Sequence, residues 1–131
     1  MSTEYNYVHD NEILSYCVDI QNNKLEMSTK YYDKEKINII FTDYIAHRFE
    51  YVTYTNIINH IEQTPVEKFI KKNKDMLEDG LRNAFPIFAT SIESLQVYLE
   101  KNEQRIFEIS STLGLCGFVI AKEILIEVVA I

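Results

Sequence analysis

Every second side chain is apolar in two stretches near the start of the sequence, residues 13–20 (ILSYCVDI) and 25–32 (LEMSTKYY). A period of two is typical of a strand that rests one face on a hydrophobic core. The QNNK segment between them indicates a turn, because Asn tolerates left-handed backbone. The pattern therefore predicts a β-hairpin. Its inward face comprises Leu14, Tyr16, Val18 and Ile20 in the first strand and Leu25, Met27, Thr29 and Tyr31 in the second.

A third strand is predicted in residues 36–52 (KINIIFTDYIAHRFEYV), where alternate Ile and Phe side chains share one face up to Phe41. The phase is doubtful beyond that point, because an unbroken strand would turn Asp43 and His47 into the core. An extra residue in a strand reverses the faces that follow it. We therefore expect a β-bulge near Asp43.

The middle of the sequence has helical spacing and helix start signals. Residues 64–67 (TPVE) combine a capping box with Pro at the first helical position, and Gly80 supplies a stop. Thr90 and Glu93 repeat the capping box before a second helix that runs to about Lys101. Two helices are therefore expected, after which the RIFEISST segment returns to a strand.

The last stretch, residues 113–131 (LGLCGFVIAKEILIEVVAI), is apolar enough to raise the question of a membrane span. A spanning helix needs about 20 predominantly apolar residues, and charges near its centre are costly. Lys122, Glu123 and Glu127 interrupt this stretch, whereas its Ile and Val content favours a strand. The tail is therefore predicted to be a buried sheet strand.

Composition indicates a single globular unit. The 131 residues are 47% hydrophobic and 25% charged, and no repeat or flexible linker divides them. We therefore expect one domain over residues 1–131, of the α+β class. Its predicted architecture is an antiparallel sheet of about five to six strands, with two helices from the centre of the chain packed on it.

The net charge of −7 narrows the choice of partner. Residues 1–62 hold ten acidic and five basic side chains, against ten and eight in the remainder. A negative surface repels phosphate groups, so nucleic acid and anionic membranes are poor partners and a basic protein is a plausible one. A mildly acidic balance also serves solubility alone. The first residues show no secretory signal, which favours a cytoplasmic location.

Familiar catalytic signatures are absent from the sequence. It contains no phosphate-binding Gly loop, no dinucleotide fingerprint, no nucleophile elbow and no pair of His at metal-binding helical spacing. His47 and Asp43 would lie about 13 Å apart in an unbroken strand, too far for a hydrogen bond. Cys116 lies in a Gly-flanked turn, GLCG, without an activating base close in sequence. We therefore expect no enzymatic activity, no cofactor and no metal.

Four segments follow an overall pattern of an opening strand hairpin, a helical centre and a Gly turn into a final strand, which covers most of the chain. They are HDNEILSYCVDIQNNKLEMSTKYY from His9, IAHRFEYV and NIINHI in the middle, and ISSTLGLCGFVIAKEILI from Ile109. Together they resemble small bacterial immunity proteins of the contact-dependent growth inhibition and polymorphic toxin class. The resemblance implies a non-enzymatic cytoplasmic inhibitor that binds the C-terminal domain of one cognate toxin, commonly a nuclease.

A candidate binding surface follows from the acidic first half of the chain. A nuclease presents a basic cleft to phosphates, and an acidic surface can enter that cleft as a substrate mimic. Tyr adds a rigid ring with a polar tip, which is common at recognition surfaces. The candidate toxin-binding residues are Asp19, Glu26, Tyr31, Tyr32, Asp33, Glu35 and Asp43.

Three alternative functions stay open. A small enzyme would gather His47, Asp43 or Cys116 in one concave pocket with shifted titration. A self-associating structural module would pair an exposed strand edge with a second copy of itself. The third alternative is a small-ligand-binding domain.

Overall fold

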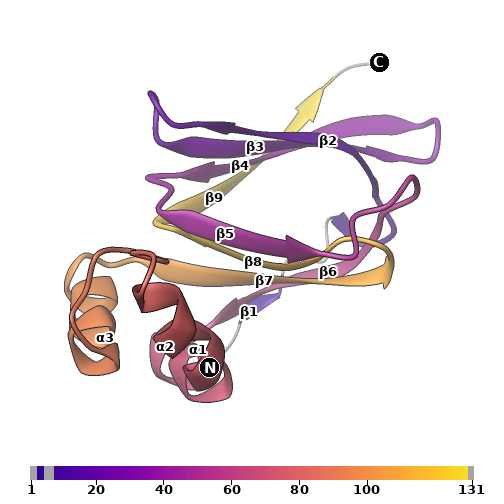
Figure 1. Ribbon diagram of the computed structural model, residues 1–131. Coiled ribbons are helices and arrows are strands. Elements are labelled where there is room, and N and C mark those ends of the chain that lie inside the picture. The colour runs from indigo at the N-terminus through magenta and orange to yellow at the C-terminus, as the bar shows by residue number, and fades with distance from the viewer. Residues whose placement is uncertain (1–2, 5–7, 130–131) are drawn as a thin grey trace.

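The computed structural model describes residues 3–4 and 8–129 (Figure 1). Within these residues, nine strands form one antiparallel sheet and three helices pack beside it, which confirms the α+β class. The sheet has more strands than the five to six expected, and there is one more helix than expected. The elements are β1 (Thr3–Glu4), β2 (Glu12–Asp19), β3 (Lys24–Tyr31), β4 (Glu35–Thr42), β5 (Ala46–Glu50), β6 (Ile57–Thr64), α1 (Val66–Lys72), α2 (Lys74–Leu81), α3 (Ile92–Lys101), β7 (Arg105–Leu113), β8 (Cys116–Ala121) and β9 (Glu123–Val129).

The sheet folds back on itself into two layers. Its strand order is β5-β8-β7-β6-β2-β3-β4-β9, with β1 paired to β6. Strands β5 to β6 in this order form a covered layer, which has the helices on its outer face, and β2 to β9 form a second layer (Figure 1). Between β6 and β2 the ladder is reduced to the single pair Glu12 and Ile57. The sheet bends where this pairing is shortest.

The chain crosses between the layers twice at the same end of the sheet. Strand β4 leads to β5 through residues 43–45, and β8 leads to β9 through Lys122. Backbone hydrogen bonds join the crossings, from Lys122 N–H to Thr42 O (2.9 Å) and from Ile45 N–H to Ile120 O (2.9 Å). We call this the kink end of the sheet.

The opposite end carries three connections, which are the β3–β4 turn (residues 32–34), the β5–β6 loop (residues 51–56) and the β7–β8 turn (residues 114–115). Strand register brings them together, because Glu12 lies opposite both Lys30 and Ile57, and Ile57 lies opposite Leu113. Figure 1 shows the three connections on the same side of the molecule. We call this the loop end.

Two hydrophobic clusters hold the layers together. The first fills the space between the two sheet layers and includes Phe41 of β4 and Phe107 of β7, whose ring centroids are 5.6 Å apart. The second lies between the covered layer and the helices, where the ring centroids of Phe118 of β8 and Phe69 of α1 are 4.8 Å apart. Strand β8 gives alternate side chains to each cluster, which explains why residues 118–121 (FVIA) are all buried.

The kink end corrects two strand predictions. Residues 36–52 do not form one strand with a bulge, because the chain turns at Asp43 with a φ of 50° and continues as the separate strand β5. The tail likewise forms β8 and β9, separated at Lys122, and residues 130–131 lie outside the described residues. Burial of the tail holds for β8, whereas β9 is partly exposed along its length.

The hairpin prediction is confirmed as β2 and β3, with one change of face. Tyr16 and Val18 lie opposite Met27 and Leu25 on the inward face, as expected. A bulge between Ile13 and Ser15 turns Ile13 inward, and Leu14 is exposed instead. Ile20 lies beyond the end of β2 and is exposed.

The helix starts differ from the predicted capping boxes. Thr64 ends β6, and its hydroxyl donates to Glu108 of β7 instead of capping α1. The second capping box is formed by Ser91 and Ser94, one residue beyond the predicted Thr90 and Glu93. Tertiary contacts therefore decide which hydroxyl is free to cap a helix.

The first predicted helix is divided in two at Asn73. This residue has a φ of −117°, and its side-chain amide donates to the carbonyl oxygen of Phe69 at 3.0 Å. Gly80 lies inside α2, which ends one residue later at Leu81. A Cβ at Gly80 would lie 2.8 Å from the carbonyl oxygen of Phe85, so this glycine permits a close backbone approach.

Replacement of Gly117 by Ala is expected to destabilise the fold. An alanine Cβ would lie 1.9 Å from the carbonyl oxygen of Arg48, at a φ of 150°. Because this clash is with the backbone of β5, relief requires β5 to move away from β8. We expect urea unfolding to show a loss of more than about 2 kcal/mol. The neighbouring Cys116→Ala is the control, and equal losses in both variants would contradict the steric argument.

Candidate functional site

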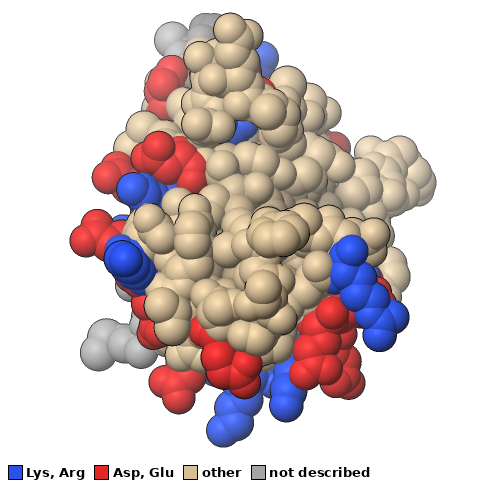
Figure 2. Space-filling model, turned by 60° about the vertical axis from the view of Figure 1, so that its left-hand side comes forward, with Lys and Arg blue, Asp and Glu red and all other residues tan. Residues whose placement is uncertain are grey.

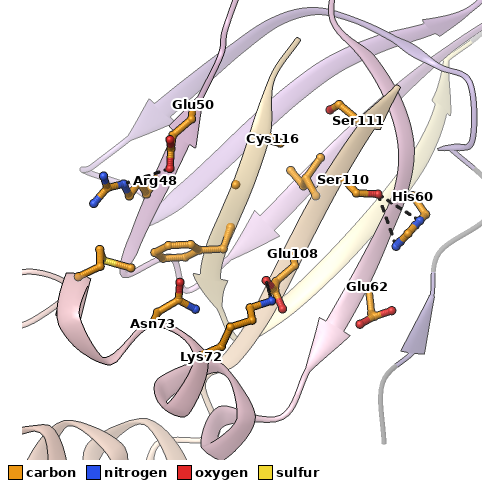
Figure 3. A pocket seen from close by; sticks show the side chains of 14 residues that line it. Arg48, Glu50, His60, Glu62, Lys72, Asn73, Glu108, Ser110, Ser111 and Cys116 are labelled. Atoms are coloured by element: carbon orange, nitrogen blue, oxygen red, sulfur yellow. Dashed lines mark hydrogen bonds and ion pairs between the residues drawn. The ribbon is translucent and has the colours of Figure 1, made fainter. Parts of the chain in front are cut away.

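A polar groove of about 640 Å³ lies on the outer face of the covered layer, beside α1 (Figure 3). Successive side chains of a strand point to opposite faces of the sheet. In β7, Phe107 and Ile109 point into the core, so Glu108 and Ser110 point outward into the groove. The side chains that face the groove therefore come from four adjacent strands and from the helices α1 and α2. The ionisable side chains among them are Arg48, Glu50, His60, Glu62, Lys72, Glu108 and Cys116.

Glu108 connects the sheet to the helices at the edge of the groove. Lys72 Nζ donates to one of its carboxylate oxygens at 2.7 Å, and the hydroxyl of Thr64 donates to the other. The Glu108 side chain is only 24% exposed. Both oxygens are thus engaged in contacts that join β6, β7 and α1, which indicates a structural role for this carboxylate.

Ser110 and His60 form a cross-strand pair in the same groove. Ser110 Oγ lies 3.1 Å from His60 Nδ1 and 3.5 Å from Nε2, and the Asn59 side-chain nitrogen lies 3.2 Å from Nδ1. A serine nucleophile needs an imidazole whose second nitrogen is oriented by another group, usually a carboxylate. Among the described residues no carboxylate contacts the His60 ring. The pair therefore lacks the third member of a catalytic triad.

Cys116 is partly buried at the β8 side of the groove. Glu50 lies opposite it on β5 and pairs with Arg48 at 3.7 Å. In the part of the chain that the structure describes, no three His, Cys, Asp or Glu side chains lie close enough to hold a metal ion. None of the described helices is long and apolar enough to cross a membrane.

Four of the seven predicted toxin-binding residues lie at the loop end, in or beside the β3–β4 turn. The rings of Tyr31 and Tyr32 meet edge to face at 4.7 Å. Asp33 is fully exposed, with Lys30 3.8 Å away, and Glu35 begins β4. This turn therefore presents aromatic and acidic side chains together.

The other three predicted residues lie elsewhere. Asp19 and Asp43 are at the kink end, and Glu26 lies along β3 with Lys24 3.6 Å away. Hydrogen bonds from the side chain and backbone of Asn22 lower the pKa of Asp19. Because β3 is eight residues long, roughly 23 Å separates the two ends. The seven residues therefore do not form one contiguous patch.

His47 pairs with Tyr44 rather than with Asp43. Tyr44 Oη and His47 Nδ1 are 2.6 Å apart, while Asp43 is exposed at the turn. Burial lowers the pKa of His47 and raises the pKa of Tyr44, so burial favours the neutral form of both groups. The His47 ring also packs against Phe49 and Tyr16. This cluster closes the gap between β2 and β5, which indicates a packing role.

Four exposed side chains at the loop end lie outside the predicted binding surface, namely Tyr51, Val52, Tyr54 and Leu113. The β5–β6 loop that holds the two tyrosines is fixed by Asn56, whose side chain accepts from Thr53 N–H at 3.0 Å. The feature of the sequence that could have pointed to these side chains is the run YVTYTN (residues 51–56), in which aromatic and apolar residues fall between two strands. Its exposure could not be predicted without knowing which strands pair.

Comparison with known proteins supports the fold alone. No protein-family model matches the chain, and no curated protein matches it. A crystal structure of an uncharacterized protein from Neisseria gonorrhoeae is similar, with a TM-score of 0.54 and 10% sequence identity. The match covers 97% of each chain, so the two proteins share the same general fold.

Replacement of His47 by Gln is expected to flatten the acid dependence of stability. Burial lowers the pKa of His47 below 6.5, its ordinary value. Below about pH 6.5 the unfolded chain therefore binds a proton that the folded chain does not, and the free energy of unfolding falls until the pH reaches the folded-state pKa. Urea midpoints measured between about pH 7.5 and about pH 5 should fall less in His47→Gln than in the unmodified protein.

The control for this measurement is His9→Gln, which removes an imidazole that is 54% exposed. It shows what the change from His to Gln does at an exposed position. A slope in His47→Gln equal to that of the control would show that burial of His47 does not oppose its protonation.

Proposed function

We propose that the protein is a cytoplasmic immunity protein that binds and neutralises the C-terminal domain of a cognate toxin, a basic nuclease. The observation that carries the proposal is the acidic surplus of the chain, a net charge of −7. Carboxylates can occupy the place of phosphates in a basic cleft and block the path of the nucleic acid. The resemblance to immunity proteins in the sequence supports the same class of partner.

The acidic surplus is distributed over the molecule. Described carboxylates outside the eight ion pairs include Glu35 at the loop end, Asp43 and Glu123 at the kink end, and Glu62 in the groove. On the side shown in Figure 2, acidic and basic side chains adjoin around the margin, and a broad central area carries neither. The net acidic charge of the whole molecule attracts a basic partner from a distance.

A catalytic function has less support from the groove. Ser110 and His60 meet there without a carboxylate to orient the imidazole among the described residues. Glu108 is engaged by Lys72 and Thr64. A binding function needs no such catalytic arrangement, and the exposed aromatic and acidic side chains of the β3–β4 turn suit it.

The direct test is neutralisation in growing cells. A candidate basic toxin domain, taken from the genes that flank the one for this protein, would be expressed with and without the protein. We expect the domain alone to stop growth, and co-expression to restore it through a stable complex of the two purified proteins. Growth arrest that persists despite comparable amounts of both proteins would overturn the proposed function.

Charge reversal at the two ends of the sheet is expected to affect association unequally. Asp33→Lys with Glu35→Lys changes the loop end, and Asp43→Lys with Glu123→Lys changes the kink end by the same total charge. At low ionic strength we expect the loop-end pair to slow association with the basic domain about tenfold, because opposite charges close to the contact steer the encounter most. The kink-end pair, which is the matched control, should slow it less. Unchanged association in both variants would refute the charge-mimic mechanism.

A further inference from the structure

We infer that the loop end is the surface that docks on the basic toxin domain, through Tyr51, Val52, Tyr54 and Leu113. This inference rests on the proposed function and adds the part of the molecule that makes the contact. The four side chains are 75%, 50%, 96% and 52% exposed, in that order. Large apolar side chains that gather in the open mark interaction surfaces, and tyrosine gives much contact area for few rotatable bonds.

The two segments that carry these side chains are bonded to each other. Leu115 N–H donates to Asn56 Oδ1 at 2.9 Å, which ties the β7–β8 turn to the β5–β6 loop. Leu113 lies opposite Ile57 in the ladder between β7 and β6. The β3–β4 turn, with Tyr32 63% exposed, lies at the same end of the sheet (Figure 1). The β5–β6 loop and the β7–β8 turn therefore present their exposed side chains together, with the β3–β4 turn at the same end of the sheet (Figure 1).

The β5–β6 loop is held in shape before any partner arrives. Asn56 is 7% exposed, and its side chain accepts from Thr53 N–H at 3.0 Å and donates to Thr53 O at 2.7 Å. Its backbone carbonyl accepts from Ile13 N–H of β2 at 2.8 Å. A loop fixed in this way loses little conformational entropy on binding, so more of the contact energy appears as affinity.

The distribution of charge at the loop end is that of a protein interface. The β5–β6 loop, YVTYTN, has no charged residue. Around it lie ion-paired side chains, with Glu50 beside Arg48 at 3.7 Å and Glu12 beside Lys30 at 3.9 Å. An apolar, aromatic centre within a charged rim is the arrangement in which a few central residues carry most of the binding free energy.

The net charge indicates which kind of partner binds at the loop end. A protein of net charge −7 repels a second copy of itself, and it repels nucleic acid and anionic membranes. A basic protein domain is attracted instead. The loop end therefore suits a basic domain that offers apolar pockets for the tyrosine rings beside cationic side chains for Asp33 and Glu35.

The test uses the full chain with Tyr51→Ser and Tyr54→Ser together, and measures affinity for the same candidate basic domain. We expect binding to weaken about 100-fold or more, since central aromatic anchors dominate interfaces of this kind. The control is Phe88→Ser with Tyr98→Ser, which removes rings that are 87% and 42% exposed but lie outside the loop end. The control should bind within about threefold of the unmodified protein.

The possible results distinguish a failure of the docking surface from a failure of the proposed function. If the loop-end variant keeps its thermal midpoint and binds within about threefold of the unmodified protein, the docking surface is overturned and the proposed function stands. If the unmodified protein does not bind the basic domain, both are overturned. Sedimentation of the protein alone adds a further outcome, because a dimer that the loop-end variant abolishes would assign the surface to a second copy.

Discussion

The buried side chain of Asn56 is the contact on which the loop end depends. One oxygen accepts from Thr53 N–H and Leu115 N–H, and the nitrogen donates to Thr53 O. The oxygen can reach both segments only because Gly114 has no side chain, since a Cβ there would lie 2.3 Å from it. Gly114 also has a φ of 75°, which other residues adopt at a cost. One amide thus fixes the loop, the turn and their mutual position.

The same region joins the two layers of the sheet. Ile13 N–H donates to Asn56 O, and Ile58 N–H and Asn11 O are 2.9 Å apart. Asn11 is fully buried, and its side chain donates to Thr29, whose hydroxyl donates to Ile37 O at 2.8 Å. A chain of polar contacts therefore runs through the core from Asn11, just before β2, through Thr29 of β3 to Ile37 of β4. Burial makes such contacts strong and their geometry restrictive, so the core specifies one pairing of the layers.

Local pattern predicted more of the fold than of the candidate site. The β2–β3 hairpin could be predicted because both strands and their turn are adjacent in sequence. The division of residues 36–52 could not, because it depends on β5 pairing with β8 some 70 positions away. Thr64 had the sequence of a helix cap, yet Glu108, 44 residues away, takes its hydroxyl. For the same reason the acidic residues could be named from the sequence, whereas their separation into two ends required the register.

The two crossings at the kink end also make two ladders of the sheet long-range in sequence. The last described strand, β9, pairs with β4, and β8 pairs with β5, so each ladder closes over a long intervening chain. Long-range pairings of this kind form slowly, because the ends must meet before contacts repay the lost chain entropy. During synthesis the hairpin and helices can form early, while β4 keeps an unpaired edge until β9 has emerged. The edge of β4 is therefore covered only when translation has passed β9.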